Sequence, residues 1–95
     1  MDIENIRNAI RKNKVNISDH ADDELYYSTL HGEVIEDYSD DMPFPSSLIY
    51  GKDLKDRNIH SVWAYSEKHE IAILITAYIP DPKKWINYKI RKPKR

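Results

Sequence analysis

The spacing of apolar residues changes partway along the chain, and this change predicts helices first and strands afterwards. Near the start, apolar residues recur at helical spacing, at Ile3, Ile6, Ala9 and Ile10. Asp2 comes directly before them and is a good N-cap residue. We therefore expect a first amphipathic helix whose apolar stripe faces the core.

A second helix is expected between Ser18 and Gly32. Ser18 is a good N-cap, and the acidic residues that follow it favour the positive end of a helix, where backbone N–H groups lack partners. Gly32 fits the C-terminal stop of this helix. From Glu33 onwards the apolar period changes to two, which is typical of strands.

Period-two patterns bounded by polar residues, proline and glycine predict four antiparallel strands, and a short alternating pattern near the end predicts a fifth. The four strands cover residues 34–38, 46–50, 59–66 and 71–79, and the fifth covers 86–91. The segment 71–79 is apolar on both faces, so we expect it in the middle of the sheet. Asp81 and Pro82 predict a single helical turn before the fifth strand.

This order of elements predicts the fold class. Helices followed by strands with short connections indicate an α+β fold, with an N-terminal helical segment packed on one face of a four- to five-stranded antiparallel sheet. The other face of the sheet is expected to be open. His60 or Trp63, together with Thr76 and Tyr78, are candidates for ligand contact on that face.

Composition narrows the class of protein further. The chain has 95 residues, enough for a single domain spanning 1–95, with a basic tail at about 89–95. It contains no cysteine, which excludes disulfides, thiolate zinc sites and cysteine nucleophiles. No apolar run is long enough to cross a bilayer and the start does not resemble a signal peptide, so we expect a soluble cytoplasmic protein.

Charge is divided unevenly between the two halves of the chain. Residues 1–50 hold eleven acids against four bases, whereas residues 51–95 hold eleven bases against five acids. The division suggests either a basic surface for a polyanion or an acidic surface for a basic partner. Charges that interleave once the chain folds are the simpler alternative.

Few side chains are candidates for chemistry. With two glycines there is no phosphate-binding loop, and the four histidines lack the spacing of a zinc site, so no metal is expected. His20, His60 and Tyr78 are candidate acids or bases. Each also has a structural interpretation. His20 could be a capping or surface imidazole, His60 a hydrogen-bonded histidine at a sheet edge, and Tyr78 a ring packed on its neighbours. Lys83 and Lys84, with the basic tail, are candidate contacts for RNA phosphates, and a solvated terminus is the alternative.

An ordered set of short motifs resembles a known family. The motifs are Ile17-Ser-Asp-His-Ala21, Gly32-Glu-Val-Ile-Glu-Asp-Tyr38, Pro45-Ser-Ser-Leu-Ile49, His60-Ser-Val-Trp63, and Ile75-Thr-Ala-Tyr-Ile-Pro-Asp-Pro82 followed by Trp85. Together they resemble the small bacterial family called domain of unknown function 4258, and the resemblance covers nearly the whole chain.

The resemblance implies a function. Members of this family are often found next to small proteins with an MqsA-like zinc finger, an arrangement typical of toxin and antitoxin pairs. Their order of elements looks like that of RelE-like and MqsR-like messenger-RNA endonucleases, which cut without a metal or other cofactor. Such an enzyme needs a base, an acid and cations on the phosphate. The resemblance implies His60 and Tyr78 for proton transfer, and Arg57 or Lys83 and Lys84 for the phosphate. His20 remains a further candidate acid or base, and Arg91 of the basic tail a further candidate for RNA binding.

A second hypothesis is a non-catalytic binding module or degenerate toxin of the same family. Many relatives carry an arginine soon after the His-Ala motif, whereas this chain has Asp22-Asp-Glu24 there, which would repel RNA. An acidic N-terminal half that docks a basic partner is then the function expected. The partners to consider are a zinc-finger antitoxin, messenger RNA and a further copy of the chain, with no membrane.

Overall fold

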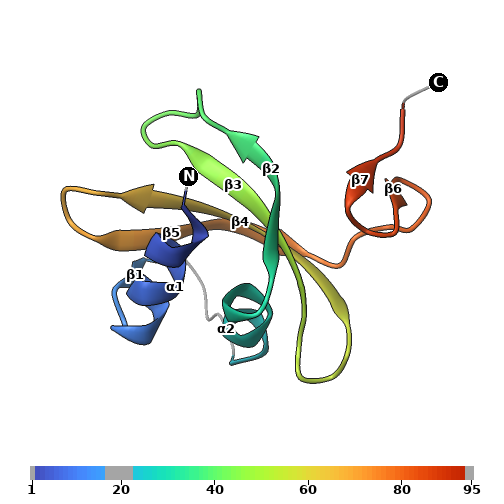
Figure 1. The fold of residues 1–95 in the computed structure, drawn as a ribbon, viewed down its shortest axis with the longest axis horizontal. Helices are drawn as coiled ribbons and strands as arrows, with labels where there is room; N and C mark the ends of the chain where they lie inside the picture. The colour runs from blue at the N-terminus through green and yellow to red at the C-terminus, as the bar shows by residue number, and fades with distance from the viewer. Residues whose placement is uncertain (1, 17–22, 94–95) are drawn as a thin grey trace.

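A computed structural model describes residues 2–16 and 23–93 as an α+β fold, in agreement with the sequence prediction. Two helices and a five-stranded, mostly antiparallel sheet make up the body of the molecule, and a two-stranded hairpin follows (Figure 1). The elements are α1 (Ile3–Arg11), β1 (Val15–Asn16), α2 (Asp23–Leu30), β2 (Glu33–Tyr38), β3 (Ser46–Lys52), β4 (Asn58–Ser66), β5 (Ile71–Tyr78), β6 (Trp85–Ile86) and β7 (Ile90–Arg91).

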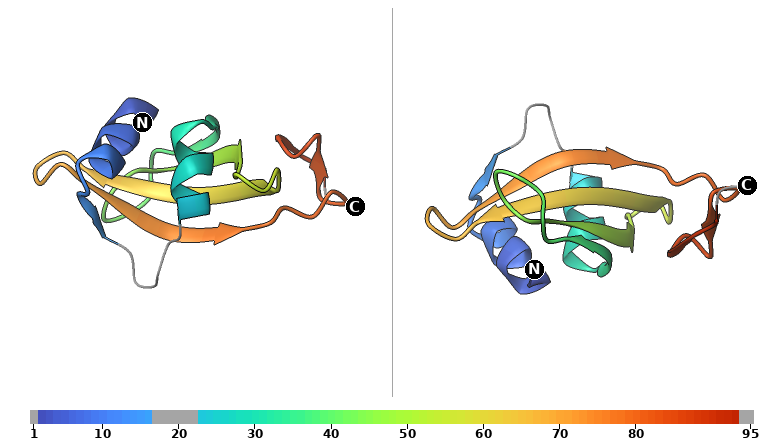
Figure 2. Two further views of the ribbon diagram at one scale, coloured as in Figure 1. Left: turned by 90° about the horizontal axis from the view of Figure 1, so that it is seen from below. Right: turned by 90° about the horizontal axis from the view of Figure 1, so that it is seen from above.

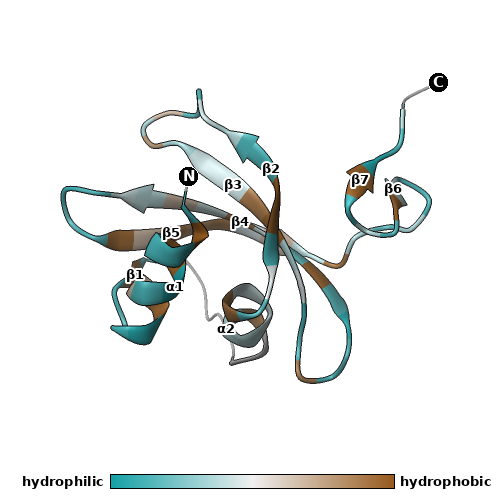
Figure 3. Cartoon of the chain, in the orientation of Figure 1, coloured by the Kyte–Doolittle hydropathy of each residue, from teal (hydrophilic) through white to brown (hydrophobic). Residues whose placement is uncertain are grey.

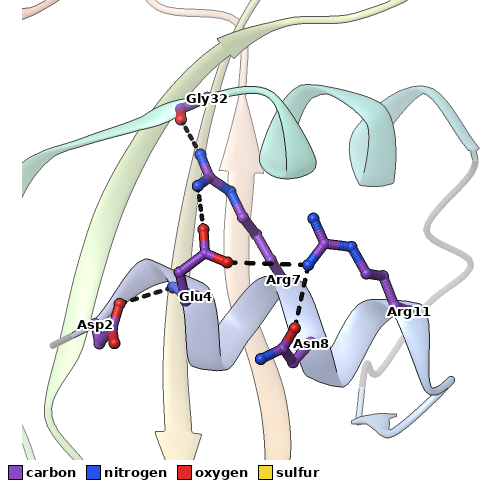
Figure 4. Close-up of polar contacts among 6 residues, drawn as sticks. All are labelled: Asp2, Glu4, Arg7, Asn8, Arg11 and Gly32. Atoms are coloured by element: carbon purple, nitrogen blue, oxygen red, sulfur yellow. Dashed lines mark hydrogen bonds and ion pairs between the residues drawn. The ribbon is translucent and has the colours of Figure 1, made fainter.

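The first helix begins as the sequence predicts. The Asp2 carboxylate accepts a hydrogen bond from the Glu4 backbone N–H at 2.9 Å, which satisfies one unpaired donor of the first turn. Arg7 donates to the Gly32 carbonyl at 2.6 Å and also pairs with Glu4 (Figure 4). This arginine therefore connects α1 to the chain segment between α2 and β2.

The main sheet has the order β1-β5-β4-β3-β2. The pairs from β2 to β5 are antiparallel, and β4 lies between β3 and β5. The sequence prediction missed β1, a two-residue strand that pairs in parallel with β5 through Val15 and Ala72. The predicted cap at Ser18 lies outside the described residues.

The core lies between the helices and one face of the sheet. Buried residues of α1, Ile6 and Ala9, pack against Ile49, Trp63 and Ala72 of the sheet. Both helices lie on the same side of the sheet (Figure 2). Figure 3 shows hydrophobic residues on β2 and β5 where these strands pass the helices, and hydrophilic residues on the outward side of α1. Burial of this apolar surface is the main stabilising contribution.

Both glycines permit a close approach between α2 and β3. A Cβ on Gly51 would lie 2.0 Å from the Ser28 carbonyl oxygen, and a Cβ on Gly32 would lie 2.5 Å from the Tyr50 carbonyl oxygen. Gly32 follows the end of α2 as predicted, but neither glycine has a positive φ. The helix end therefore requires glycine for space and not for a left-handed backbone.

The prediction that segment 71–79 lies in the middle of the sheet is wrong. Its strand, β5, is second from one side, and in the described part of the chain β1 pairs only with Ala72 and Ile73. The side chain of Ile75 is 53% exposed. Apolar residues on both faces thus do not mark a central strand here, and β4 takes that place.

The predicted fifth strand at 86–91 is also wrong. Residues 85–91, which we call the C-terminal hairpin, form a separate two-stranded sheet in which Trp85 pairs with Arg91. Asn87 and Tyr88, at the turn, have φ values of 51° and 63°, the positive pair that a type I′ turn requires. The hairpin lies across β2 from the two helices (Figure 1).

Truncation of two isoleucines tests this assignment of the core. Ile49→Ala should lower the free energy of unfolding by about 2 to 5 kcal/mol, because Ile49 is fully buried and its loss leaves a cavity. Ile75→Ala is the matched control and should change it by about 0.5 kcal/mol or less, because that side chain is exposed. Denaturant unfolding measures both, and equal losses would contradict the fold.

Candidate functional site

The His60 side chain lies at the centre of a polar cluster on the sheet face that is turned away from the helices. The strand register places His60 of β4 opposite Tyr50 of β3 and Tyr78 of β5. The imidazole has no exposed surface, because the C-terminal hairpin covers it. The Trp85 ring of the hairpin meets it edge to face, with ring centroids 4.5 Å apart.

Both nitrogens of the His60 ring have partners, and these partners fix its tautomer. Nε2 lies 2.6 Å from the backbone carbonyl oxygen of Tyr88, which can only accept a hydrogen bond. In the neutral imidazole the proton therefore sits on Nε2, and Nδ1 carries the lone pair. The Tyr78 hydroxyl, 3.2 Å from Nδ1, then donates its proton to that lone pair.

Burial keeps both members of the His60–Tyr78 pair neutral at neutral pH. The pKa of His60 is lowered from its ordinary value, chiefly because burial disfavours the imidazolium, and the hydrogen bond to the Tyr88 carbonyl partly opposes this. Burial likewise raises the pKa of Tyr78. The tyrosine is the more accessible of the two, at 39% exposed. The pair therefore combines an available base with a hydroxyl that reaches solvent.

A cation and its counter-ion lie beside this pair. The Arg91 guanidinium stacks over the Trp85 ring at 4.6 Å and donates to the Glu36 carboxylate at 3.1 Å. The bond from Arg91 lowers the pKa of Glu36. Tyr38 also donates to Glu36, and burial together with this bond raises the pKa of Tyr38 to about 12.

The turn of the hairpin is anchored by aromatic and charged contacts. The Tyr88 ring is nearly parallel to the Tyr50 ring at a centroid distance of 6.3 Å. The Lys89 ammonium lies 5.8 Å from the centre of the Tyr50 ring and 3.0 Å from the Glu33 carboxylate. These contacts hold the Tyr88 carbonyl against His60.

The structure brings some of the sequence-predicted residues together and leaves others apart. His60 and Tyr78 are in contact and Arg91 is close by, but His60 is buried and not on the open face that we expected. Trp63 lies on the opposite face, packed against α1. The other candidates are placed as follows: Arg57 pairs with the buried carboxylate of Asp53 at 2.7 Å, Lys83 and Lys84 are exposed in the turn after β5, and His20 lies outside the described residues.

Sequence reasoning missed Glu36, Tyr50 and Tyr88 as members of the cluster. Glu36 and Tyr50 lie on strands that were correctly predicted, but nothing in their local pattern indicates that a distant hairpin packs on them. Tyr88 was interpreted as an alternating strand residue. Tyrosine rarely adopts a positive φ, so the sequence gives no signal for its position in the turn.

A cavity of about 550 Å³ lies apart from this cluster, on the side of the molecule where α1 begins. Its walls combine the aromatic residues Phe44 and Tyr65 with the carboxylates of Asp2 and Glu67. Within residues 2–16 and 23–93, no group of three or more acidic or histidine side chains is arranged to hold a metal ion. None of the helices described here is long and apolar enough to span a bilayer.

The lowered pKa of His60 predicts how stability depends on pH. The folded protein holds this pKa below the ordinary 6.5, so the unfolded chain binds the proton first as the pH falls. The stability that the neutral imidazole contributes is thus complete above pH 6.5 and is lost below it, as the pH falls through the folded pKa.

A glutamine variant isolates this contribution. His60→Gln retains an N–H donor for the Tyr88 carbonyl but does not titrate, so its unfolding midpoint should fall less than that of the wild type between about pH 7.5 and about pH 5. Thermal unfolding at a series of pH values measures both slopes. Parallel slopes would mean that the His60 pKa is the same in the folded and unfolded states.

Comparison with known proteins identifies the family. The model of a family described as "Domain of unknown function (DUF4258)" matches residues 1–79, which include His60 and Tyr78 but end before the C-terminal hairpin. Neither a curated protein nor a solved structure matches the chain. Because the family model covers well over half of the sequence, this chain belongs to the DUF4258 family.

Proposed function

We propose that this chain is the toxin of a toxin and antitoxin pair and cleaves messenger RNA without a metal. The observation that carries the proposal is the contact between the Tyr78 hydroxyl and the His60 Nδ1 lone pair, with the Arg91 guanidinium close by. Metal-independent cleavage requires a base for the ribose 2′-hydroxyl, an acid for the leaving oxygen and a cation for the phosphate, all at one point. This cluster offers the base and the cation.

The exposure of the two residues suggests how the proton moves. Tyr78 reaches solvent and His60 does not, so the ribose 2′-hydroxyl would meet the tyrosine oxygen. That oxygen takes the 2′ proton as its own proton passes to Nδ1 of His60, which becomes an imidazolium. The 2′-oxygen then forms its bond to phosphorus, and the bond to the 5′-oxygen breaks. The 5′-oxygen takes a proton from water as it leaves, which gives a 2′,3′-cyclic phosphate and a free 5′-hydroxyl.

Phosphate charge is the second requirement. Arg91 interacts electrostatically with both His60 and Tyr78, and it would exchange the Glu36 carboxylate for a phosphate oxygen. Lys83 and Lys84, exposed in the turn that leads to the hairpin, would contact neighbouring phosphates. Arg57 is less suited, because Asp53 already occupies its guanidinium.

The family relationship supports the biological setting that we propose. Family members often have MqsA-like zinc-finger proteins as neighbours, so a zinc-finger antitoxin is the partner and the cytoplasm the place of action. We also propose that the architecture is RelE-like or MqsR-like. Functional inference from architecture is an analogy, so the site residues carry the test.

Three variants test the proposed reaction. In EDTA, the wild type should cleave messenger RNA, and His60→Ala and Tyr78→Phe should each lower the rate by about 10²- to 10⁴-fold. Lys83→Ala should mainly weaken RNA binding and reduce its salt slope by about one. Cleavage of end-labelled messenger RNA, with growth arrest on expression, measures these effects.

His69→Ala is the control for the histidine change, because His69 is exposed in the turn between β4 and β5. It should cleave RNA at the wild-type rate. Wild-type protein that neither cuts RNA nor arrests growth would exclude the nuclease and leave the second candidate function.

The second candidate is a non-catalytic binding module that uses the cavity of about 550 Å³ near the start of α1. Its aromatic walls, Phe44 and Tyr65, with the carboxylates of Asp2 and Glu67 beside them, suit an apolar segment that carries a lysine or arginine. The burial of His60, with both ring nitrogens bonded, also favours this function. The docked partner would be the product of the neighbouring gene.

A pair of glutamates tests the binding module. Glu67→Gln removes a charge from the cavity and should weaken binding of the neighbouring gene product about two- to fivefold. Glu70→Gln removes the same charge from the same turn, outside the cavity, and should leave binding unchanged. Calorimetric titration measures both, and equal affinities would contradict docking at the cavity.

A further inference from the structure

The C-terminal hairpin closes the site at which the proposed nuclease would act. The Tyr88 carbonyl oxygen accepts a hydrogen bond from Nε2 of His60, the Trp85 ring packs perpendicular to the imidazole, and no part of His60 reaches solvent. In this arrangement Arg91 is bound to Glu36 and is not free for a phosphate. RNA therefore cannot reach His60 or pair with Arg91 while the hairpin stays in place.

The hairpin is not part of the core between the helices and the sheet. The residues of that core and the apolar side chains packed on them belong to elements from α1 to β5. Trp85 of the hairpin is also buried, at 5% exposed, but it packs against His60 on the opposite face of the sheet. The residues that match the family model likewise end at 79. The body of the fold can therefore keep its packing when the hairpin moves.

Besides the buried Trp85 ring and the Tyr88 contacts, two exposed ion pairs hold the hairpin, and these open readily. Lys89 pairs with Glu33 at 3.0 Å and Arg91 with Glu36 at 3.1 Å, so both ion pairs join the hairpin to β2. The four side chains are between 25% and 56% exposed. Exposed ion pairs contribute little to stability and are weakened by salt or by a competing anion.

The backbone of the turn also favours release. Tyr88 has a φ of 63°, a left-handed conformation that is costly for a bulky side chain. Its ring on Tyr50 and its carbonyl on His60 hold this conformation in the closed state. Opening removes both contacts and lets the strained residue relax.

We propose that the C-terminal hairpin is an autoinhibitory lid, and that the phosphate backbone of RNA opens it by taking Lys89 and Arg91 from Glu33 and Glu36. This inference rests on the proposed nuclease function, because it names what regulates that site. The lid carries the cations that RNA needs, so binding of the substrate and exposure of His60 are one event. The free protein is then inactive until a polyanion arrives.

The labile proton on Nε2 of His60 reports opening directly. Because this proton is donated to the lid's own carbonyl, it exchanges with water only when the lid leaves His60. The indole N–H of Trp63 provides an internal reference. It donates to Ser61 Oγ at 3.0 Å within the buried core on the other face of the sheet. Solvent-exchange NMR measures both protons in one full-length sample.

Two double variants with equal charge changes test whether the two ion pairs hold the lid closed. E33Q/E36Q removes the carboxylates that pair with Lys89 and Arg91 of the lid. It should speed exchange of the His60 proton by about 2- to 30-fold, which corresponds to the free energy of two exposed ion pairs. RNA cleavage should rise by the same factor. D56N/E70Q removes two other exposed ion pairs, with Lys52 and Lys14, and should leave both rates unchanged. The Trp63 proton should exchange at the same rate in all samples.

The outcomes separate the lid from the nuclease. Equal His60 exchange in E33Q/E36Q and D56N/E70Q would overturn the lid, even if the wild type cuts RNA. Faster His60 exchange in E33Q/E36Q without RNA cleavage by any variant would support a lid that opens and would overturn the nuclease. Equal acceleration of the His60 and Trp63 protons would mean global unfolding and would also overturn the lid.

Discussion

The buried imidazole of His60 is the constraint on which the arrangement of this sheet face depends. A polar ring without solvent must find partners for both nitrogens, since an unsatisfied buried group is costly. Here Tyr78 of β5 satisfies one nitrogen and the Tyr88 carbonyl satisfies the other. The same two hydrogen bonds therefore set the tautomer, the protonation state and the position of a hairpin that the core does not require.

This arrangement brings together opposite charges from the acidic and the basic halves of the sequence. Two acids of β2, Glu33 and Glu36, come from the acidic half of the chain, and their partners Lys89 and Arg91 come from the basic half. The contact interleaves charges, as the simpler of the sequence interpretations expected. It also leaves the basic groups at the rim of the site, where a polyanion would compete for them.

Much of the fold could be predicted from the sequence because its signals are local. The cap at Asp2 and the period-two patterns place α1 and the strands β2 to β5 within a few residues of their observed bounds. Position within the sheet is not a local property. Ile75 looks like a central residue by pattern, yet it lies at the register shift between Leu74 and Thr76 and is 53% exposed.

The candidate site was predictable in part for the same reason. The sequence pattern placed His60 or Trp63 on one face of the sheet with Tyr78, and the register puts His60 directly opposite Tyr78. The burial of His60 could not be predicted, because it comes from a hairpin whose turn holds Tyr88 in a conformation that its residue type does not favour. A contact of this kind between distant segments has no signature in the local pattern.

One measurement tests the central claim, that the His60 cluster is an RNA site beneath a lid. The ring nitrogens of His60 can be followed by NMR during titration with a 2′-O-methyl RNA oligonucleotide, which lacks the nucleophile and cannot be cleaved. We expect the His60 Nε2 resonance to shift as its bond to the Tyr88 carbonyl breaks, while the Trp63 indole resonance stays constant. Unchanged His60 resonances at saturating RNA would contradict the account.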